Sequence, residues 1–222
     1  MKAFILAAGK GTRLNPLNSN LPKPLIKTKG KPLILWNIEK LRDSGINDIV
    51  INLFHKGEQI KEFLGDGSEY GVKIQYSEED ELLGTGGGIG NSLSLLGEGV
   101  FLLISADVWT DLDLNKIVLE KPKSAHLILK NNPKEYPEGD LSLQGGLVKD
   151  SAEPLRLTFS GIALIDPCIF NNIKEKHYGL WESVLKPACS KDFVTGELYE
   201  GTMFNVNTPE DIEKLDALLN EE

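Results

Sequence analysis

Short apolar runs rich in β-forming residues alternate along this chain with amphipathic segments, and this alternation limits the fold more than any other feature of the sequence. Four of the runs, residues 3–7, 49–53, 72–76 and 100–105, are predicted to be strands. Strands joined through helices run parallel, because the crossover returns the chain to the edge of the sheet where it started. The sequence therefore predicts an α/β protein in which helices cover a mostly parallel sheet.

Helices are expected at four places. One spans about residues 32–44 and has Pro32 in its first turn, another begins near Gly57, and a third follows the glycine run at 86–88. The last follows Thr208-Pro209-Glu210-Asp211, which supplies an N-cap, a first-turn proline and an acidic third position. This helix should end the fold and dock on it.

The turn-rich stretch 131–153 interrupts the alternation and precedes a further predicted strand at 157–165. We interpret this stretch as an insertion that covers the functional site. A chain of 222 residues is close to the upper size of one compact unit, and no repeat, linker or low-complexity tract marks a boundary. We therefore expect a single domain over residues 1–222.

Composition excludes several classes of protein. No apolar run approaches the roughly 18 residues of a membrane span, and the N-terminus lacks an apolar signal region, so we expect a cytoplasmic protein with no membrane partner. Cys168 and Cys189 are the only cysteines and form no CxxC pair, and the three histidines are far apart in sequence. This pattern predicts neither a disulfide framework nor a zinc site.

The distribution of charge indicates an anion site. The formal net charge of -9 argues against a nucleic acid partner, which usually requires a basic face. Residues 1–38 nevertheless contain seven of the 24 lysines and arginines and no acidic residue, whereas the rest of the chain has 17 basic and 33 acidic residues. A local anion site explains this asymmetry, and chance clustering on a solvated face is the alternative.

A loop rich in glycine and cations directly follows the first predicted strand. Its sequence is Leu6-Ala7-Ala8-Gly9-Lys10-Gly11-Thr12-Arg13-Leu14, and here backbone amides can converge on an anion. Downstream, Lys23 lies between two prolines that restrict its backbone, so its ammonium group is held at low entropic cost. Arg13 and Lys23 offer a planar fork and a compact charge, which together predict a clamp for a triphosphate.

The spacing of this loop differs from that of the common nucleotide motifs. A P-loop requires GxxxxGK[ST], which the chain lacks. The dinucleotide fingerprint GxGxxG also fails, because Asn15-Pro16 stands near the place of its third glycine. The composite from Leu6 to Leu25 thus carries more information than its GxG alone.

The stretch from Leu6 to Leu17, followed by Pro22-Lys23-Pro24-Leu25, resembles the signature of the sugar-phosphate nucleotidyltransferases, also called nucleotide-sugar pyrophosphorylases. The resemblance implies the nucleotide-diphospho-sugar transferase fold, a single-domain Rossmann-like α/β/α arrangement around a mainly parallel, mixed central sheet. It implies a nucleotide-binding half, about residues 1–110, and a sugar-binding half, about residues 111–222. It also implies that the loop, with Arg13 and Lys23, binds the nucleotide and serves catalysis.

Two further motifs gain roles from this resemblance. The turn at 81–89 matches the segment that lies against the nucleobase in the family, with Thr85 and Gly86 as the candidates for that contact. Asp107 follows the carboxyl end of the strand at 100–105, where open α/β sheets bind their ligands, and a carboxylate there suits Mg²⁺. The family assigns this aspartate to Mg²⁺ at the α-phosphate.

The second metal position departs from the family pattern. The family usually has an aspartate in a segment such as Asp-Val-Gly-Thr-Pro, whereas this chain has Asn205-Val206-Asn207-Thr208-Pro209. Asn205 stands at the place of the aspartate and Asn207 at that of the glycine, and an amide oxygen can also coordinate Mg²⁺. Asn205 is therefore the first candidate for the second ligand and Asn207 the reserve, with a strand end before a capped helix as the alternative.

Other segments are similar to the small bacterial N-acetylmuramate 1-phosphate uridylyltransferases, which recycle the sugar of cell-wall peptidoglycan. These segments are Asn132-Pro133, Pro137-Glu138-Gly139-Asp140, Thr158-Phe159-Ser160-Gly161-Ile162, Asp107-Val108-Trp109-Thr110-Asp111 and the run 82–89. By this resemblance, Gly139, Asp140, Ser160 and Trp109 are placed near the sugar. Gly84 departs from that pattern, since a glutamate usually stands before Thr-Gly-Gly-Gly.

The resemblance implies one reaction and leaves rivals open. In that reaction a phosphate oxygen of a sugar 1-phosphate attacks the α-phosphorus of UTP and displaces pyrophosphate, with Mg²⁺ as cofactor and no protein nucleophile. The rivals are transfer of a guanylyl, thymidylyl or cytidylyl group to another sugar or alcohol phosphate, a likeness to molybdenum-cofactor nucleotidyltransferases, and a nucleotide-binding regulatory subunit without turnover. The sequence does not indicate an oligomeric state or an effector.

Overall fold

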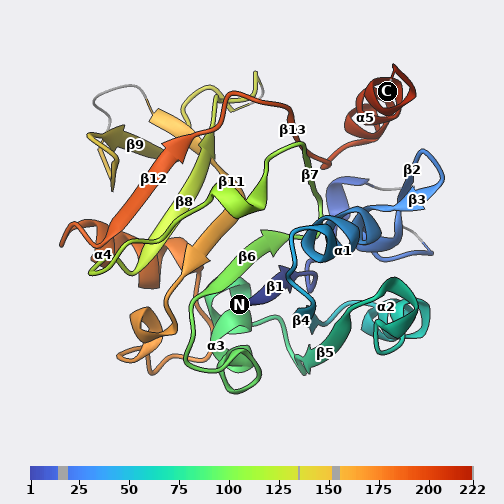
Figure 1. Ribbon diagram of the computed structural model, residues 1–222, viewed down its shortest axis with the longest axis horizontal. Helices are drawn as coiled ribbons and strands as arrows, with labels where there is room; N and C mark the ends of the chain where they lie inside the picture. Colours follow the sequence, from blue (N-terminus) through green and yellow to red (C-terminus); the bar gives the residue numbers. More distant parts are fainter. Residues whose placement is uncertain (15–19, 135, 152–155, 222) are drawn as a thin grey trace.

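A nine-stranded mixed sheet organises the computed structural model, which describes residues 1–14, 20–134, 136–151 and 156–221 (Figure 1). The strands, in their order across the sheet, are β5 (Lys73–Glu78), β4 (Asp48–Leu53), β1 (Lys2–Leu6), β6 (Phe101–Ser105), β11 (Arg156–Ile165), β8 (Ala125–Lys130), β12 (Val194–Leu198), β10 (Leu147–Lys149) and β9 (Leu141–Gln144). The five strands predicted from the sequence correspond to β1, β4, β5, β6 and β11, so those predictions are confirmed.

The two ends of this sheet differ in strand direction. Strands β5, β4, β1 and β6 are all parallel, as their connections through helices require. From β6 onward the pairs β6–β11, β11–β8, β12–β10 and β10–β9 are antiparallel, and only β8–β12 is parallel. The sheet is thus mixed, with its continuous parallel part confined to the first half of the chain.

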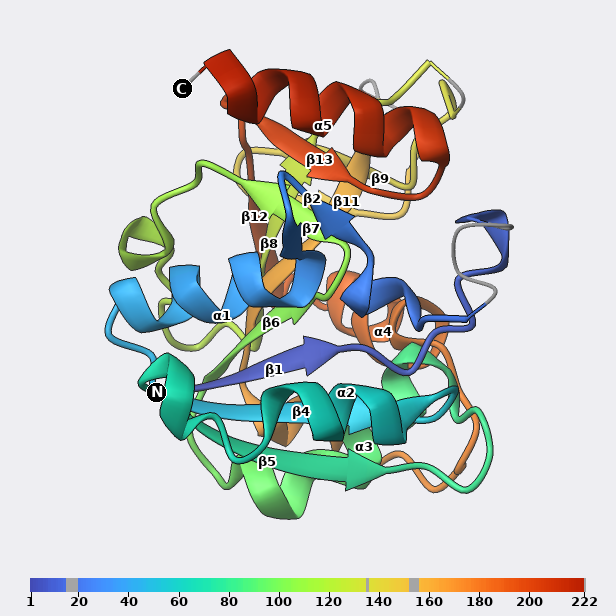
Figure 2. The ribbon, with the colours of Figure 1, turned by 90° about the vertical axis from the view of Figure 1, so that its right-hand side faces the viewer.

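Helices cover both faces of the sheet, as the three-layer prediction requires (Figure 2). Helices α1 (Leu33–Asp43) and α2 (Gly57–Leu64) pack on one face, and α3 (Gly84–Leu96) packs on the other together with a π-helical turn, Trp181–Leu185, and α4 (Lys186–Cys189). Because side chains alternate along a strand, Ile5 points to the first face and Phe4 to the second.

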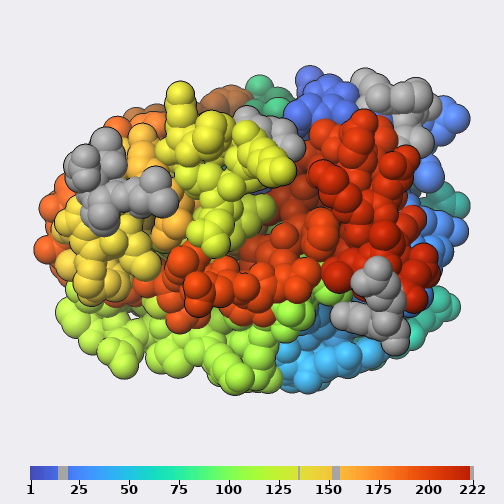
Figure 3. Space-filling model, turned by 90° about the horizontal axis from the view of Figure 1, so that it is seen from above, coloured from blue at the N-terminus to red at the C-terminus, as the bar shows by residue number. Residues whose placement is uncertain are grey.

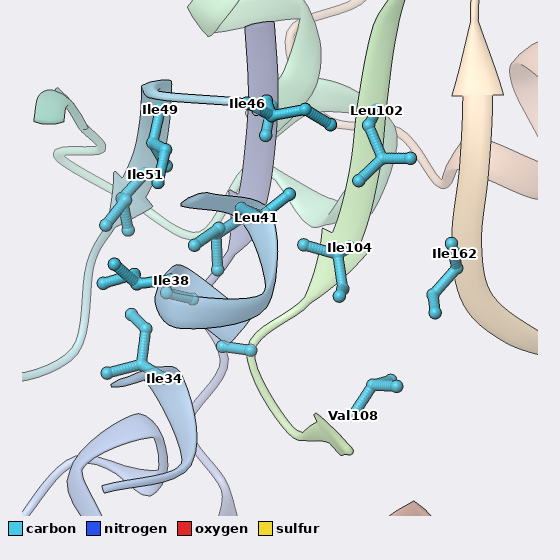
Figure 4. Close-up of a cluster of buried hydrophobic side chains, with 14 of the residues drawn as sticks. Ile34, Ile38, Leu41, Ile46, Ile49, Ile51, Leu102, Ile104, Val108 and Ile162 are labelled. Carbon is cyan, nitrogen blue, oxygen red and sulfur yellow. The ribbon is translucent and has the colours of Figure 1, made fainter. Parts of the chain in front are cut away.

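Helix α1 shows why an amphipathic segment takes this place. Ile34, Ile38 and Leu41 recur at helical spacing and are fully buried against the isoleucines of β4 and β6 (Figure 4). Burying one such side chain contributes about 1.5–3 kcal/mol relative to leaving it in water. The sheet and α1 therefore form a rigid base beneath the loops that follow the strands.

Helix α3 corrects one prediction, because it begins at Gly84 and contains the glycine run that was expected to precede it. Close packing explains why glycine is tolerated inside the helix. A Cβ on Gly87 would lie 2.4 Å from the carbonyl oxygen of Lys176, and one on Gly90 would lie 2.3 Å from the hydroxyl of Tyr178. The backbone of α3 thus lies directly against residues 176–179.

The predicted C-terminal helix is α5 (Pro209–Glu221), and it docks on the fold as expected (Figures 1 and 3). Asp211 Oδ2 accepts hydrogen bonds from the backbone N–H groups of Asn207 and Thr208, both at 2.8 Å, and the Asp211 N–H donates to Thr208 Oγ1 at 3.3 Å. On the face seen in Figure 3, α5 (red) lies on one side and the turn-rich segment (yellow) on the other.

The remaining strands form two small sheets beside α5. One pairs β2 (Lys27–Thr28) with β3 (Lys31–Pro32), and the other pairs β7 (Val108–Thr110) with β13 (Met203–Asn205). The β7–β13 pair brings residues 205–207 next to the segment after β6. Among the helices that the structure describes, none is both long and apolar enough to cross a bilayer.

Candidate active site

A cavity of about 430 Å³ lies at the carboxyl ends of the parallel strands. Leu6 ends β1, Ser105 ends β6, and Asn52 lies one residue before the end of β4. The cavity is lined by Leu6, Ala7, Ala8, Gly9, Lys10, Gly11, Thr12, Arg13, Lys23, Pro24, Asn52, Glu79, Leu82, Gly84, Thr85, Ser105, Ala106, Asp107 and Asn207. Sheets of this kind bind ligands at this edge, where loops from several strands converge.

The loop after β1 is shaped by its glycines. Gly11 has a φ of 62°, a left-handed conformation that favours glycine, and it starts a single turn that the Leu14 N–H closes on the Gly11 carbonyl at 3.0 Å. Leu14 is fully buried and anchors the turn. A Cβ on Gly9 would meet no atom within 4 Å, so the backbone there faces open space in the cavity.

A buried polar network supports the floor of this cavity, and the sequence did not reveal it. Asn52 Oδ1 accepts a hydrogen bond from the Ala7 N–H at 2.8 Å, and Asn52 Nδ2 donates to Glu79 Oε1 at 2.7 Å. Glu79 Oε2 in turn accepts from the Leu83 N–H at 3.1 Å. The network therefore joins the glycine loop to the start of α3, and the satisfied partners offset the cost of burying a carboxylate.

Two cations, one carboxylate and one amide meet at the mouth of the cavity. Lys23 Nζ donates to Asp107 Oδ2 and also to Asn207 Oδ1, the latter at 2.9 Å. Arg13 donates to the same Asn207 oxygen at 2.9 Å. The structure thus brings together Arg13, Lys23 and Asp107, which lie far apart in the sequence.

The local backbone explains how Lys23 is presented. Pro22 is extended, with φ of -67° and ψ of 147°, and a short turn over Lys23–Leu25 buries Pro24 and Leu25 beneath the lysine. The Lys23 side chain is 14% exposed and that of Asp107 is 24% exposed. This pair is therefore partly shielded from solvent, where charge interactions are stronger than at an open surface.

A second cavity of about 660 Å³ opens next to the first. It is lined by Leu6, Arg13, Thr85, Ser105, Asp107, Lys130, Pro133, Tyr136, Asp140, Leu141, Arg156, Thr158, Phe159, Gly161, Leu180, Trp181, Glu182, Leu185, Asn205 and Asn207. Arg13, Asp107 and Asn207 line both cavities, so the two spaces meet at these side chains. The expected insertion, in its described residues, supplies part of the wall of the second cavity.

Lys130, which sequence reasoning missed, is a half-buried cation in the second cavity. It ends β8, and its Nζ donates to Asn205 Oδ1, while Asn205 Nδ2 donates to the Ser160 carbonyl at 3.0 Å. Burial lowers the pKa of the Lys130 ammonium, and the carboxylates of Asp107, Asp211 and Asp140 act in the opposite direction. The sequence feature that could have revealed Lys130 is its position at the end of an apolar strand.

The far wall of the second cavity carries a further cation and a carboxylate. Arg156 donates to the backbone carbonyl of Asp140, and Asp140 Oδ2 accepts from the Phe159 N–H at 3.0 Å. Among the described residues, the buried Nε of Arg156 has no hydrogen-bond partner. Arg156 also lines the cavity, so its guanidinium group can donate to a polar ligand there.

The oxygen atoms at the junction of the cavities are of the kind that Mg²⁺ prefers. Asp107 offers a carboxylate, and Asn207 offers an amide oxygen that is linked to it through Lys23. Asn205, the first candidate from the sequence, instead has its amide oxygen bonded to Lys130. Among the described residues, no group of three or more His, Cys, Asp or Glu side chains forms a metal cluster, so such an ion would rely on substrate and water oxygens as well.

The structure places most of the predicted site residues at the cavities. The first cavity is lined by the expected nucleotide residues Leu6, Ala8, Gly9, Lys10, Gly11, Thr12, Arg13, Lys23 and Thr85. Of the expected sugar residues, Asp140 lines the second cavity, as do both candidate metal ligands Asn205 and Asn207. Residues 15–17, the end of the quoted loop signature, lie outside the described residues.

Four expected site residues line neither cavity. Gly86 is buried, and a Cβ there would lie 2.4 Å from the Tyr178 ring. Ser160 is fully buried and its Oγ accepts from the Ile162 N–H at 3.2 Å, while Gly139 forms a turn with φ of 62°. Trp109 packs edge-on against Phe204 in the cluster beneath α5. These four residues therefore have structural surroundings that account for them without a ligand.

A glycine loop at the carboxyl ends of parallel strands, with two cations and a carboxylate at the junction with a second polar cavity, is the arrangement of an enzyme that transfers a group from a nucleotide. Residues 2–138 match the model of the nucleotidyl transferase family. The chain belongs to this family, and within it to the sugar-phosphate nucleotidyltransferases. It is therefore an enzyme that transfers a nucleotidyl group to a sugar 1-phosphate.

Two relatives match this chain over almost their whole length. It is 41% identical to the N-acetylmuramate alpha-1-phosphate uridylyltransferase of Neisseria meningitidis, with 94% of each chain covered. It is 30% identical to the D-glycero-alpha-D-manno-heptose 1-phosphate guanylyltransferase of Campylobacter jejuni, over 95% of this chain and 96% of the other. A solved structure from Bacillus anthracis, a putative glucose-1-phosphate thymidylyltransferase in complex with a sucrose, shares the fold with a TM-score of 0.86, at 24% identity and over 100% and 96% of the two chains.

Proposed function

We propose that this enzyme transfers the uridylyl group of UTP to N-acetylmuramic acid 1-phosphate and releases pyrophosphate, in the recycling of cell-wall sugar in the cytoplasm. The observation that carries the proposal is the meeting of the two cavities at Arg13, Asp107 and Asn207. A nucleotide in the first cavity and a sugar phosphate in the second would have their reacting phosphates at this junction. The 41% identity to a relative with this activity supports the choice of substrates.

The chain's own groups at the junction suit the alignment of two anions. Arg13 and Lys23 offset the repulsion between the phosphates, and the open backbone at Gly9 lets the triphosphate approach closely. The acceptor phosphate is ionised at neutral pH, so no protein base or nucleophile is required. Holding these donors in place before the reaction is the main contribution that the protein makes to the rate.

Mg²⁺ is the proposed cofactor, with Asp107 and the amide oxygen of Asn207 as its ligands from the protein. When bound there, it would neutralise charge on the phosphates as a Lewis acid. Lys23, which is hydrogen-bonded to both residues in this structure, then has phosphate oxygens as its alternative partners.

The second cavity suits an acidic sugar. N-acetylmuramic acid carries a carboxylate besides its phosphate, and the cavity is lined by the cations Lys130 and Arg156 in addition to Arg13 at the junction. Arg156 lines the cavity, and a carboxylate is a fitting acceptor for its guanidinium fork.

The test is a panel of UTP, GTP, CTP and dTTP, each with N-acetylmuramic acid 1-phosphate and with N-acetylglucosamine 1-phosphate, in Mg²⁺ or in EDTA. Pyrophosphate release gives the rate and mass detection identifies the product. We expect the UDP-sugar of the muramic acid to form fastest, and only with the metal. Faster turnover of GTP, or of a neutral sugar, would replace the proposed substrates, and triphosphate binding with no product would indicate a regulatory subunit.

A further inference from the structure

Asn205 and Lys130 form a hydrogen-bonded pair in the second cavity. Asn205 stands where the sequence pattern of the family usually has an aspartate, and the structure shows its amide oxygen accepting a hydrogen bond from the Lys130 ammonium group. The other end of the amide is used as well, because Asn205 Nδ2 donates to the Ser160 carbonyl at 3.0 Å. The orientation of the amide is therefore determined by partners on both sides.

This pair lies on the side of the junction where we propose that the sugar 1-phosphate binds. Lys130 and Asn205 line the second cavity and not the first, whereas Asp107 and Asn207 line both. The carboxylates of Asp107, Asp140 and Asp211 act electrostatically on Lys130, which places its ammonium group in a strongly acidic part of the site. Without a fixed cation, these carboxylates would repel an incoming phosphate.

We infer that Lys130, held by Asn205, binds the phosphate of the sugar 1-phosphate, so that a fixed ammonium group stands where the family pattern has a carboxylate. This inference rests on the proposed function only in taking a sugar 1-phosphate as the acceptor. Asn205 is a positioning residue in it and not a metal ligand, since its amide oxygen is directed at Lys130. Neutralising one carboxylate and adding one cation changes the local charge in the direction that favours a second anion.

The first test is a binding measurement without turnover. Isothermal titration of N-acetylmuramic acid 1-phosphate and of glucose 1-phosphate, in EDTA and without nucleotide, compares the wild type with Lys130→Met. We expect the variant to bind both compounds at least about tenfold more weakly, the equivalent of about 1.4 kcal/mol. Lys123→Met is the matched control, because Lys123 donates to the Asp192 carbonyl on the surface and lines neither cavity.

Steady-state kinetics then separate acceptor binding from a general structural effect. For Lys130→Met we expect a higher KM for the sugar 1-phosphate and an unchanged KM for the triphosphate, with partial recovery in Lys130→Arg. Equal weakening for both substrates, or titration curves that match the wild type, would overturn the inference. Circular dichroism melting of each variant identifies a fold that has been lost.

Asn205→Asp distinguishes a positioning role from a metal role. If Asn205 holds Lys130, a carboxylate at position 205 forms an ion pair with the ammonium group and neutralises its charge. The KM for the sugar 1-phosphate then rises, while the Mg²⁺ concentration that gives half-maximal rate stays the same. If Asn205 is a metal ligand, the added charge lowers that Mg²⁺ concentration instead, and this outcome contradicts the inference. A wild type with no activity towards any sugar 1-phosphate would reject the proposed function, whereas an active wild type with an indifferent Lys130→Met would reject only this inference.

Discussion

The two cavities are built in different ways although they share a wall. The first is lined by loops that follow parallel strands, and a buried network of Asn52 and Glu79 joins those loops from below. The second lies among the mostly antiparallel strands and a π-helical turn, and its polar groups come from distant parts of the chain. Local motifs thus form the first cavity, where we propose that the nucleotide binds (the donor side), whereas tertiary packing forms the second cavity, where we propose that the sugar 1-phosphate binds (the acceptor side).

The largest expected effect comes from Lys23, which is hydrogen-bonded to Asp107 and Asn207 at the junction of the two cavities. Lys23→Ala should leave a folded protein whose kcat is reduced by about 100-fold or more, by analogy with the loss of one preorganised donor, worth about 3 kcal/mol. Initial rates of pyrophosphate release measure this effect. Lys27→Ala, which changes an exposed lysine that lines neither cavity, should keep the rate of the wild type, and equal rates in the two variants would contradict the role of Lys23.

The network beneath the donor side gives the next effect. A Cβ on Gly88 would lie 2.6 Å from Glu79 Oε1 and 2.7 Å from Asn52 Nδ2, so Gly88→Ala should destabilise the protein by about 1–3 kcal/mol. Urea unfolding gives the free energy, and the KM for the triphosphate should rise more than that for the acceptor. Gly99→Ala is the control, because a Cβ there meets no atom within 4 Å. Similar free energies of unfolding for the two variants would show that the side chains of Asn52 and Glu79 can shift to accommodate the added methyl group.

The acceptor side is probed by Arg156→Ala. Removing this cation from the second cavity should raise the KM for an acidic sugar 1-phosphate by about tenfold, the cost of one charge-assisted hydrogen bond, and leave the KM for the triphosphate unchanged. Lys149→Ala, which removes an ion pair with Asp192 outside both cavities, serves as the control. A change in the KM for the triphosphate instead would contradict the proposal that the two cavities bind different substrates.

The smallest effect concerns the stability of the antiparallel half. Burial lowers the pKa of His126 from its ordinary value of 6.5, against the opposing pull of Glu197, and His126 Nδ1 lies 2.9 Å from Thr195 Oγ1. Because the unfolded chain then binds the proton more readily, the stability contributed by neutral His126 is present above about pH 6.5 and is lost as the pH falls through the folded-state pKa. Between pH 8 and pH 5.5, the melting temperature should fall less steeply with decreasing pH for His126→Gln than for the wild type. An equal pH dependence in the two proteins would count against this assignment.

The sequence was sufficient to predict the parallel part of the fold and most of the donor side. The loop after β1, Lys23 and Asp107 lie in or beside contiguous apolar runs, and strand direction alone brings such residues to one edge of the sheet. The helix around Gly84 was placed too late in the chain because glycine usually ends helices. Here the close approach of Tyr178 to α3, a contact between distant segments, makes glycine necessary within the helix.

The acceptor side could not be predicted to the same extent. Lys130, Tyr136 and Arg156 belong to different strands and loops, and their convergence depends on the order of β11, β8 and β9 in the sheet. Ser160 and Trp109 were expected at the sugar from short matching segments, but such matches do not specify which side of a strand faces a cavity. A shift of one position along β11 separates Ser160, which is fully buried, from Phe159, which lines the cavity.

The antiparallel pairing of β11 with β6, in which Ile162 lies opposite Ile104, joins the parallel and the mostly antiparallel parts of the molecule into one continuous sheet. The two proposed substrate sites therefore lie along one hydrogen-bonded sheet, and the backbone of that sheet sets the distance between them. Under the proposed function, substitutions on β8, β9 and β11 would change the choice of sugar without changing the residues that bind the triphosphate. Two relatives of this length are named for different substrates, one for N-acetylmuramate and a uridylyl group and the other for a heptose and a guanylyl group.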